Sequence, residues 1–382
     1  MKKIWLVLFF IFSIASSSVF SAVSLIPAPP QLSASSYILM DAYTGEILVE
    51  HNANTALPPA SITKLMTAYI IEYELARGNI TLADKVRISE KAWRMKGSRM
   101  FIREGTQVSV EDLLRGIVIQ SGNDASVAMA EYVAGSESAF ADLMNQHAQL
   151  LGMTNTYFVN STGFPAEGHY SSASDIAKLS RAKILQFPEN YKMYSEKEFT
   201  YNNIRQTNRN KLLWQDKTVD GLKTGHTEEA GYCLAASAIR NGTRLISVVM
   251  GTNSDKARAA ESQKLLNYGF RYFQTRKLYS RGQVISNAHV WGGSANSVKV
   301  GFAEDVLVTM PRQQSDSVPA SLELNKEITA PIAVGDVLGK IVVGVDGDVL
   351  VERSVVALEA VEEGGFFKRL FDNIKLFFMN LF

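Results

Sequence analysis

The stretch PPASITKLM, residues 58–66, opens an otherwise apolar segment that we expect to be helical from Ser61 to about residue 76. Residues three apart share one face of a helix, so the Ser61 hydroxyl and the Lys64 amine can meet. A lysine that burial or a nearby cation keeps uncharged can take the proton of a serine. The spacing alone is weak evidence, because residues 180–183 (SRAK) repeat it and are typical of an ordinary helix face.

Two further short motifs accompany this tetrad. Ser121-Gly122-Asn123 lies between two expected helices, where a hydroxyl can relay a proton and an amide can bind a carbonyl group. Lys223-Thr224-Gly225 precedes a β-rich run and offers a charge, a hydroxyl and a glycine that lets two backbones approach. Each motif alone is commoner as a helix-capping turn or an exposed strand entry. In the order Ser-x-x-Lys, Ser-x-Asn, Lys-Thr-Gly, at separations of about 60 and 100 residues, they form a known active-site signature.

The segments around these motifs predict a layered α+β domain over residues 37–277. A hairpin is expected at the start, with strands at 37–41 and 46–49, and another follows with strands at 232–238 and 244–251. Between and after them, hydrophobic periodicity predicts helices at 61–76, 110–120, 124–133, 137–151, 174–185 and 256–275. Strands at both ends with helices between them imply that the first and last strands share a sheet.

The pattern changes after this domain. Residues 278–360 show only short β-rich runs with turn signals, at 298–302, 306–309, 332–334, 339–345 and 349–358. We expect a small all-β domain of sandwich or barrel type there.

The N-terminus is typical of an export signal. Two lysines precede a short apolar run and then small residues, which predicts a signal peptide over residues 1–21 and a Pro-, Ser- and Ala-rich linker over residues 22–36. The alternative is an uncleaved membrane anchor, which the shortness of the apolar run disfavours, because a span needs about 20 apolar residues.

The C-terminus, residues 364–382, follows two glycines and has apolar residues at helical spacing, with its charged residues gathered on one arc. Charges midway along the segment would lie in hydrocarbon if it crossed a bilayer. We therefore expect a helix in the plane of the membrane surface, with the basic residues towards anionic head groups. The alternative is a terminal helix docked on the protein's own core.

Composition excludes several classes of protein. With 39 Lys and Arg against 38 Asp and Glu, the chain has no basic field to bind nucleic acid. Cys233 is the single cysteine and the five histidines show no metal-ligand spacing, so neither an intramolecular disulfide nor a metal site is expected. We expect Cys233 to be a small buried side chain.

Together these features make the sequence similar to the penicillin-binding protein and serine β-lactamase superfamily. More narrowly, it resembles the low-molecular-mass D-alanyl-D-alanine carboxypeptidases of the penicillin-binding protein 5 type. The resemblance covers the export signal, the β-rich domain, the amphipathic tail and the segments PASITKLM, IQSGNDASVAMAE, NRNKLLW, DGLKTGHTEEAGY and RAAESQKLLNYGFRYF. It implies a β-lactamase/transpeptidase-like domain, with helices on an antiparallel sheet, then a small all-β domain and a C-terminal amphipathic helix.

The resemblance also implies a function for each motif residue. Ser61 would be the acylated nucleophile and Lys64 its general base. Ser121 would pass a proton to the leaving D-alanine, and Asn123 would hold the peptide amide of the substrate.

The third motif would bind the substrate's end. Lys223 would supply positive potential that keeps the general base uncharged, and Thr224, followed by Gly225, would bind the terminal carboxylate. The backbone N–H groups of His226 and of the nucleophile would form the oxyanion hole, typically worth roughly 10² to 10³ in rate per donor. Arg258 would help to bind the carboxylate; the alternative for it is an exposed helix charge.

The implied reaction is removal of the terminal D-alanine from peptidoglycan stem pentapeptides through an acyl-enzyme, without metal or organic cofactor. β-Lactams would acylate the same serine, and the protein would lie at the periplasmic face of the inner membrane. A homodimer is compatible with the sequence, and acceptor choice, which separates carboxypeptidase from endopeptidase or transpeptidase, is left open.

Two rival functions remain at this point. The first is a hydrolytic serine β-lactamase, against which the chain lacks the Glu-x-x-Leu-Asn segment that supplies the deacylation base in the commonest of those enzymes. The second is a catalytically silent wall-binding scaffold, against which all motif residues are present.

Overall fold

The computed structural model describes residues 26–313, 319–345 and 348–379. The predicted signal peptide, residues 1–21, and the first residues of the predicted linker, 22–25, lie outside the described residues. Residues 26–35 of the linker form neither helix nor strand and contact the body of the protein, whereas Ser36 already belongs to the first strand. Tyr268 Oη donates a hydrogen bond to Pro27 O at 2.9 Å, and Leu32 packs against a buried apolar cluster.

An antiparallel sheet of five strands, in the order β2-β1-β9-β8-β7, forms the centre of the larger part. Its strands are β1 (Ser36–Asp41), β2 (Ile47–His51), β7 (Val219–Thr227), β8 (Gly231–Arg240) and β9 (Thr243–Thr252). Ile38 of β1 lies opposite Val248 of β9, so the start of the chain pairs with a strand more than 200 residues away. The expectation that the first and last strands share one sheet is confirmed.

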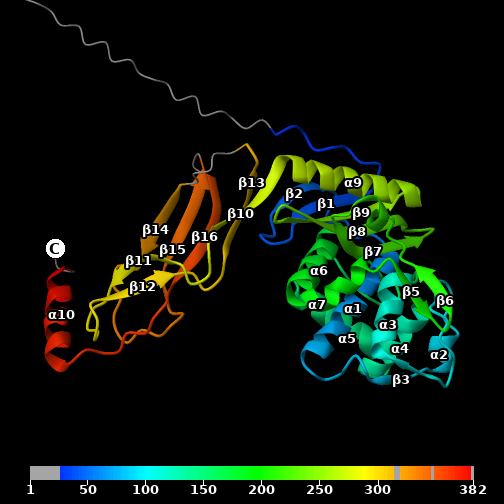
Figure 1. Cartoon of the computed structure of the whole chain (residues 1–382), viewed down its shortest axis with the longest axis horizontal. Helices are drawn as coiled ribbons and strands as arrows, with labels where there is room; N and C mark the ends of the chain where they lie inside the picture. The colour runs from blue at the N-terminus through cyan, green and yellow to red at the C-terminus, as the bar shows by residue number, and fades with distance from the viewer. Residues whose placement is uncertain (1–25, 314–318, 346–347, 380–382) are drawn as a thin grey trace, which may run out of the picture.

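Both faces of this sheet are covered. Successive side chains of a strand point to opposite faces, and in β1 Ile38 and Met40 belong to the larger core whereas Tyr37 and Leu39 belong to the smaller one. Figure 1 shows α9 along one face of the sheet and most other helices of this part on the opposite face. The short helix α8 packs with α9, because its Leu212 and Leu213 belong to the smaller core. The helices are α1 (Lys64–Ala76), α2 (Glu90–Trp93), α3 (Val110–Arg115), α4 (Asn123–Ala134), α5 (Glu137–Leu150), α6 (Ala173–Gln186), α7 (Pro188–Tyr191), α8 (Leu212–Gln215), α9 (Asp255–Tyr272) and α10 (Phe366–Met379). Shorter helical turns are η1 (Ala60–Thr63), η2 (Gly116–Gln120) and η3 (Lys192–Ser195), and two small hairpins pair β3 (Lys85–Arg87) with β4 (Gln107–Ser109) and β5 (Glu198–Tyr201) with β6 (Ile204–Thr207).

Two predicted helices are irregular where the sequence motifs lie. The helix expected from Ser61 begins as the 3₁₀ turn η1 and becomes α-helical only at Lys64. The helix expected over 110–120 loosens after Arg115 into the π-helical turn η2, which ends at Ser121 in a left-handed backbone conformation. Turns of this kind are frequent at functional sites because they re-aim side chains.

The smaller part begins directly at the end of α9. The helix expected over 256–275 is wrong at its end, because it stops at Tyr272 and the chain continues as strand β10 (Phe273–Tyr279), paired with β13 (Val306–Pro311). A second sheet has the order β11-β12-β16-β15-β14. Its strands are β11 (Val284–His289), β12 (Ser297–Gly301), β14 (Ala320–Leu324), β15 (Val337–Val345) and β16 (Asp348–Ala357).

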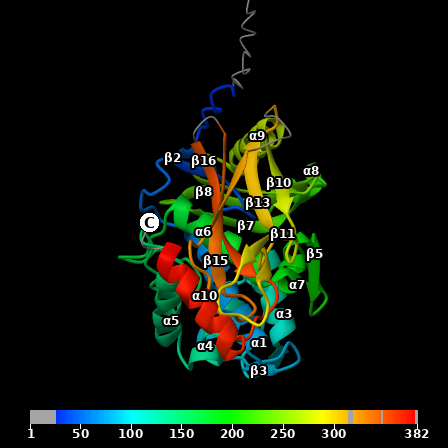
Figure 2. The same ribbon diagram turned by 90° about the vertical axis from the view of Figure 1, so that its left-hand side faces the viewer.

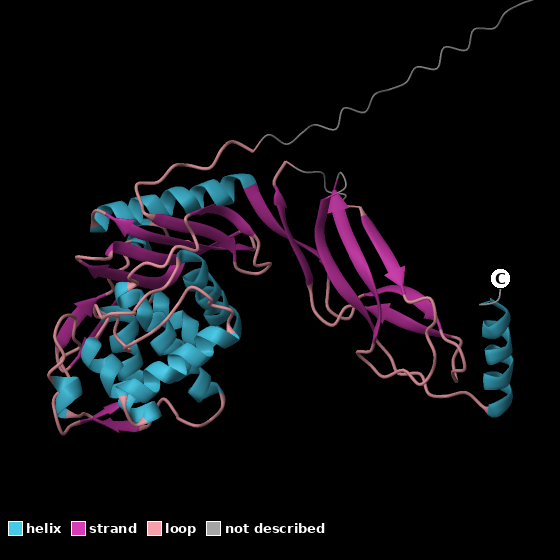
Figure 3. Cartoon of the chain, turned by 180° about the vertical axis from the view of Figure 1, so that it is seen from behind, coloured by secondary structure: helices cyan, strands magenta, loops and turns pink. Residues whose placement is uncertain are grey.

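The strands β11 and β14 are not anticipated from the sequence, and the strand expected at 332–334 is wrong, since Ile332 forms only an isolated bridge with Val361. The smaller part has its own apolar core, which includes Val298, Val300 and Val355. Figures 1 and 3 show these strands beside the larger part and α10 at the end remote from it, and Figure 2 shows the molecule from the side on which α10 lies.

Candidate active site

The first motif brings a hydroxyl and an amine into contact. Lys64 Nζ lies 3.0 Å from Ser61 Oγ, across the junction of η1 and α1. Ser61 is partly exposed at the wall of a cavity of about 530 Å³, whereas Lys64 is 1% exposed. The pair therefore has its reactive oxygen facing the cavity and its amine behind it.

The burial of Lys64 changes its protonation. Its pKa is lowered to about 7, first by burial and then by the positive charge of Arg209, while the Asp124 carboxylate acts in the opposite direction. A lysine with a pKa near the working pH is available as a general base. The chemistry predicted from the Ser61–Lys64 spacing is thus supported by both geometry and electrostatics.

The second motif lies at the end of η2. Ser121 has φ 66°, is 2% exposed and lines the cavity, and its hydroxyl has no hydrogen-bond partner among the described residues. Asn123 is buried and donates from Nδ2 to Lys96 O at 2.7 Å. The adjacent Asp124 carboxylate accepts the backbone N–H groups of residues 100–102, which fixes the loop beside this motif.

The third motif lies on β7, at the edge of the central sheet. A side chain at Gly225 would place its Cβ 2.9 Å from Pro59 O and 3.2 Å from Ile62 Cγ1, so only glycine lets this strand lie against the nucleophile turn. Thr224 lines the cavity. Lys223 is buried and donates to Thr224 O at 3.0 Å; burial, and then the charges of Lys64 and nearby arginines, lower its pKa well below the usual value.

His226 and Arg258 border the same cavity. The His226 ring packs against the Tyr232 ring, with the centroids 3.9 Å apart and the two planes tilted by 30°. Arg258 is 7% exposed, so the alternative of an exposed helix charge is wrong. Its Nη1 donates to Gly225 O at 3.0 Å and its Nη2 pairs with Asp255, so this guanidinium also holds β7 in place.

The structure thus places six of the nine predicted site residues at the wall of one cavity, and the other three, which belong to the same motifs, are buried. Ser61, Ser121, Thr224, Gly225, His226 and Arg258 line the cavity, whereas Lys64, Asn123 and Lys223 do not.

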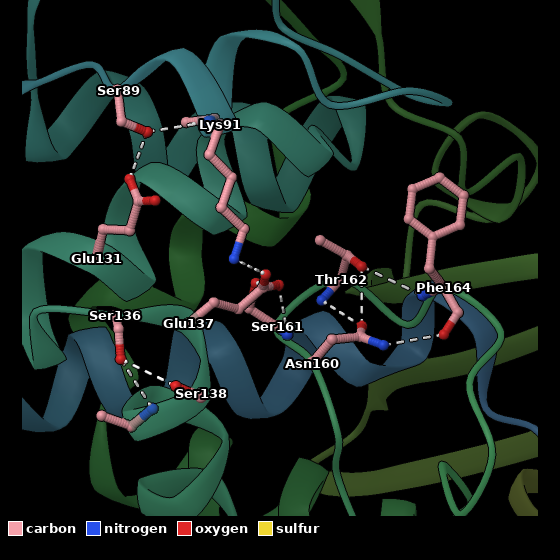
Figure 4. Close-up of polar contacts among 12 residues, drawn as sticks. Ser89, Lys91, Glu131, Ser136, Glu137, Ser138, Asn160, Ser161, Thr162 and Phe164 are labelled. Carbon is pink, nitrogen blue, oxygen red and sulfur yellow. Dashed lines mark hydrogen bonds and ion pairs between the residues drawn. The ribbon is translucent and has the colours of Figure 1, made fainter.

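A turn over residues 160–164 completes the surroundings of Lys64 and was not predicted. Thr162 O accepts a hydrogen bond from Lys64 Nζ at 2.5 Å, and Ser161 O accepts one from Thr67 Oγ1 at 2.7 Å. Figure 4 shows the turn beside Glu137. The residues of the turn are ordinary loop residues, so nothing local in the sequence indicates that they contact the nucleophile helix.

Arg209 was also missed. It lines the cavity, donates from Nε to Gln120 O at 3.1 Å and is the charge that lowers the pKa of Lys64 most. The family resemblance implied that Lys223 has that electrostatic effect, but burial disfavours the charged form of Lys223 itself. The segment NRNKLLW contributed to the family resemblance, but nothing in it distinguishes Arg209 from an exposed charge.

Replacing Arg209 by Gln is expected to raise the pKa of Lys64, because a positive charge that disfavours the ammonium form is removed. At pH 7 fewer molecules then carry an uncharged Lys64: an increase of one unit from about 7 lowers that fraction from about one half to about one tenth. The pH dependence of penicillin acylation checks this result: the acid limb should move to higher pH, with the rate partly regained in alkaline buffer. Arg77→Gln, on the exposed end of α1, is the control and should leave the limb in place.

The described residues hold no group of three or more His, Cys, Asp or Glu side chains that could bind a metal ion. Cys233, opposite Gly225 in the sheet, is fully buried, and burial raises the pKa of its thiol to about 11. It is a small buried side chain, as expected.

Comparison with known sequences gives two matches along the chain. Residues 24–254 match the family described as D-alanyl-D-alanine carboxypeptidase, and residues 273–363 match the C-terminal domain of penicillin-binding protein 5. The chain belongs to the D-alanyl-D-alanine carboxypeptidase family. It is 45% identical over 367 residues to D-alanyl-D-alanine carboxypeptidase DacA of Escherichia coli K12, covering 94% of this chain and 91% of that one. It is 44% identical over 381 residues to DacC of the same strain, covering 98% and 95%.

Solved structures agree with the family assignment. Penicillin-binding protein 5 from Haemophilus influenzae superimposes with a TM-score of 0.83 at 44% identity, over 88% of this chain and all of that one. The expected family, fold class and enzymatic function are confirmed. The chain is a serine-type D-alanyl-D-alanine carboxypeptidase of the penicillin-binding protein 5 type.

Proposed function

We propose that Ser61 is the nucleophile of this carboxypeptidase and that Lys64, in its uncharged form, is the general base. The observation that carries the proposal is the 3.0 Å separation of Lys64 Nζ and Ser61 Oγ in surroundings that lower the lysine's pKa to about 7. A lysine with its ordinary pKa would be charged and could not accept the proton. Rate contributions of such a base are typically 10² to 10⁴.

Acylation then proceeds in two steps. Ser61 Oγ attacks the carbonyl carbon of the penultimate D-alanine while its proton passes to Lys64, and the backbone N–H groups of Ser61 and His226 bind the oxyanion. When the intermediate collapses, the C–N bond breaks and the leaving amine takes a proton through Ser121. The hydroxyl of Ser121 has no partner among the described residues, so it is available for this transfer. Water then hydrolyses the ester and frees the shortened peptide.

The remaining residues would bind the substrate. Thr224 would donate to the terminal carboxylate, with Arg209 and Arg258 supplying the positive potential, and all three line the cavity. Asn123 would hold the peptide amide after exchanging its present contact with Lys96 O. Lys223 lies behind Thr224, where its ammonium would strengthen that potential when it is protonated.

The test is mass spectrometry of the purified protein after mixing with a stem pentapeptide and, separately, with penicillin. We expect free D-alanine from the peptide and a persistent adduct with penicillin on the peptide that contains Ser61. Rapid turnover of penicillin without an adduct would instead indicate a β-lactamase. The absence of both D-alanine and adduct would indicate a silent scaffold.

We also propose that α10 attaches the protein to the periplasmic surface of the inner membrane. Its side chain Asp372 is 3% exposed and accepts hydrogen bonds from Gly292 N at 2.8 Å and Lys368 Nζ at 2.5 Å. Its polar side therefore contacts the β-rich part, while Phe367 and Phe377 are 73% and 63% exposed. A helix docked on the protein's own core would instead bury its apolar side chains and expose its charged ones. No helix among the described residues is long and apolar enough to cross a bilayer, so a position in the interface plane fits this helix.

Deleting residues 366–382 is expected to move the protein from the membrane fraction to the soluble fraction, because the exposed apolar side of α10 is lost. Sedimentation with vesicles that contain anionic lipid measures the change. Replacing Phe367, Phe371 and Phe377 by serine should have nearly the same effect, whereas Val334→Ser, at an exposed apolar position of the β-rich part, should have little. Unchanged sedimentation of the truncated protein would reject the anchor.

A further inference from the structure

The general base is oriented by a backbone carbonyl that is distant in sequence. An uncharged lysine amine has two N–H bonds and one lone pair. If one N–H donates to Thr162 O, at 2.5 Å, the lone pair is left free for the Ser61 hydroxyl at 3.0 Å. The position of this carbonyl therefore determines how well the lone pair points at the proton it must take.

One side chain holds the turn that carries this carbonyl. Asn160 Oδ1 accepts from Thr162 N, Thr162 Oγ1 and Gly163 N at 3.1, 2.9 and 2.8 Å, and Asn160 Nδ2 donates to Phe164 O at 3.0 Å. These four hydrogen bonds close the turn on itself, and Figure 4 shows the three that join Asn160 to Thr162 and Phe164. A side chain that bonds its own backbone two residues on fixes a turn in this way.

The turn is also held from both sides. A side chain at Gly163 would place its Cβ 1.8 Å from Ala60 O, so the turn lies directly against η1, which carries the nucleophile. On the other side, Ser161 Oγ donates to Glu137 Oε1 at 2.8 Å, and Glu137 Oε2 pairs with Lys91 at 2.8 Å. The turn thus connects the start of α5 to the nucleophile segment.

We propose that Asn160 is a positioning residue for catalysis, acting on Lys64 through the Thr162 carbonyl. The inference rests on the proposed function of Lys64. Asn160 does not line the cavity, so its effect on substrate affinity should be small and its effect on the rate of acylation large. A misplacement of about 1 Å at a reacting group can cost 10²-fold in rate.

The experiment compares Asn160→Ala with Asn160→Asp. The alanine variant loses all four contacts, and we expect its acylation rate by penicillin to fall about 10- to 100-fold with little change in KM for the pentapeptide. The aspartate variant keeps an acceptor oxygen and adds negative charge near Lys64. Its rate at high pH should remain close to that of the wild type, while the acid limb of the pH profile moves to higher pH because the ammonium form of Lys64 is favoured.

Ser89→Ala is the matched control. Ser89 caps α2 and donates to Glu131 Oε2 at 2.6 Å in the neighbouring polar cluster, but it has no contact with the 160–164 turn (Figure 4). It should lower thermal stability without lowering the acylation rate. The proposal is overturned if Asn160→Ala acylates at the wild-type rate, or if its loss lies in KM alone, or if Asn160→Asp loses rate equally at all pH values. Lys64→Met distinguishes a failure of this proposal from a failure of the proposed function. If that variant stays active, Lys64 is not the general base.

Discussion

Ser61→Ala is expected to abolish both the release of D-alanine and the formation of the penicillin adduct. The Ser61 oxygen is the atom that becomes esterified, and within the part of the chain that the structure describes it is the one hydroxyl hydrogen-bonded to Lys64 Nζ. Removing the nucleophile of a serine hydrolase costs on the order of 10⁶-fold in kcat. The two readouts should therefore disappear together.

The second Ser-x-x-Lys tetrad offers the control for this result. Ser180 donates within its own helix to Ile176 O at 2.7 Å, and Lys183 is paired with Glu72 at 2.6 Å, with both side chains of that pair fully buried. Ser180→Ala should keep the adduct and the D-alanine release, because this hydroxyl lines no part of the cavity. Mass spectrometry and a D-alanine assay measure both variants. A penicillin adduct on Ser61→Ala would assign the nucleophile to another residue.

Lys64→Met is expected to leave Ser61 in place but to lower the rate of acylation by about 10² to 10⁴, the usual contribution of a general base. The limb of the pH profile near pH 7 should disappear with the group that causes it. Stopped-flow measurement of penicillin acylation between pH 5.5 and 9 checks both results. A profile that keeps its limb near pH 7 would show that another group titrates there.

The free energy of unfolding shows whether the lower acylation rate of Lys64→Met reflects the missing base or misfolding. Burial lowers the pKa of Lys64 from 10.5 to about 7, so the unfolded chain binds more protons than the folded one between these pH values. The free energy of unfolding of the wild type should then rise with pH across this window. Lys64→Met removes this contribution, so we expect the variant to be at least as stable as the wild type at pH 7. Lys183→Met gives the contrast, because it leaves Glu72 buried without its partner, a change that typically costs 3–5 kcal/mol.

Much of the fold follows from local pattern. The helical periodicity of residues 137–151 and the Gly-containing turn between β8 and β9 indicate elements that the structure has within a residue or two. Errors occur where long-range pairing decides. The segment 273–275 continues a helical pattern but forms β10, because β13 is available to pair with it.

The candidate active site likewise has features that local sequence predicts and features that depend on long-range packing. The sequence by itself determined which residues could meet: a serine and a lysine three positions apart at a helix start, a Ser-x-Asn turn, and a Lys-Thr-Gly strand. Whether Lys64 is uncharged, and which carbonyl orients it, only the tertiary structure decided. Thr162 is 98 positions from Lys64, and Arg209 is farther still. The physical reason is that spacing fixes the neighbours along a helix, whereas desolvation and charge depend on every segment that packs around the group.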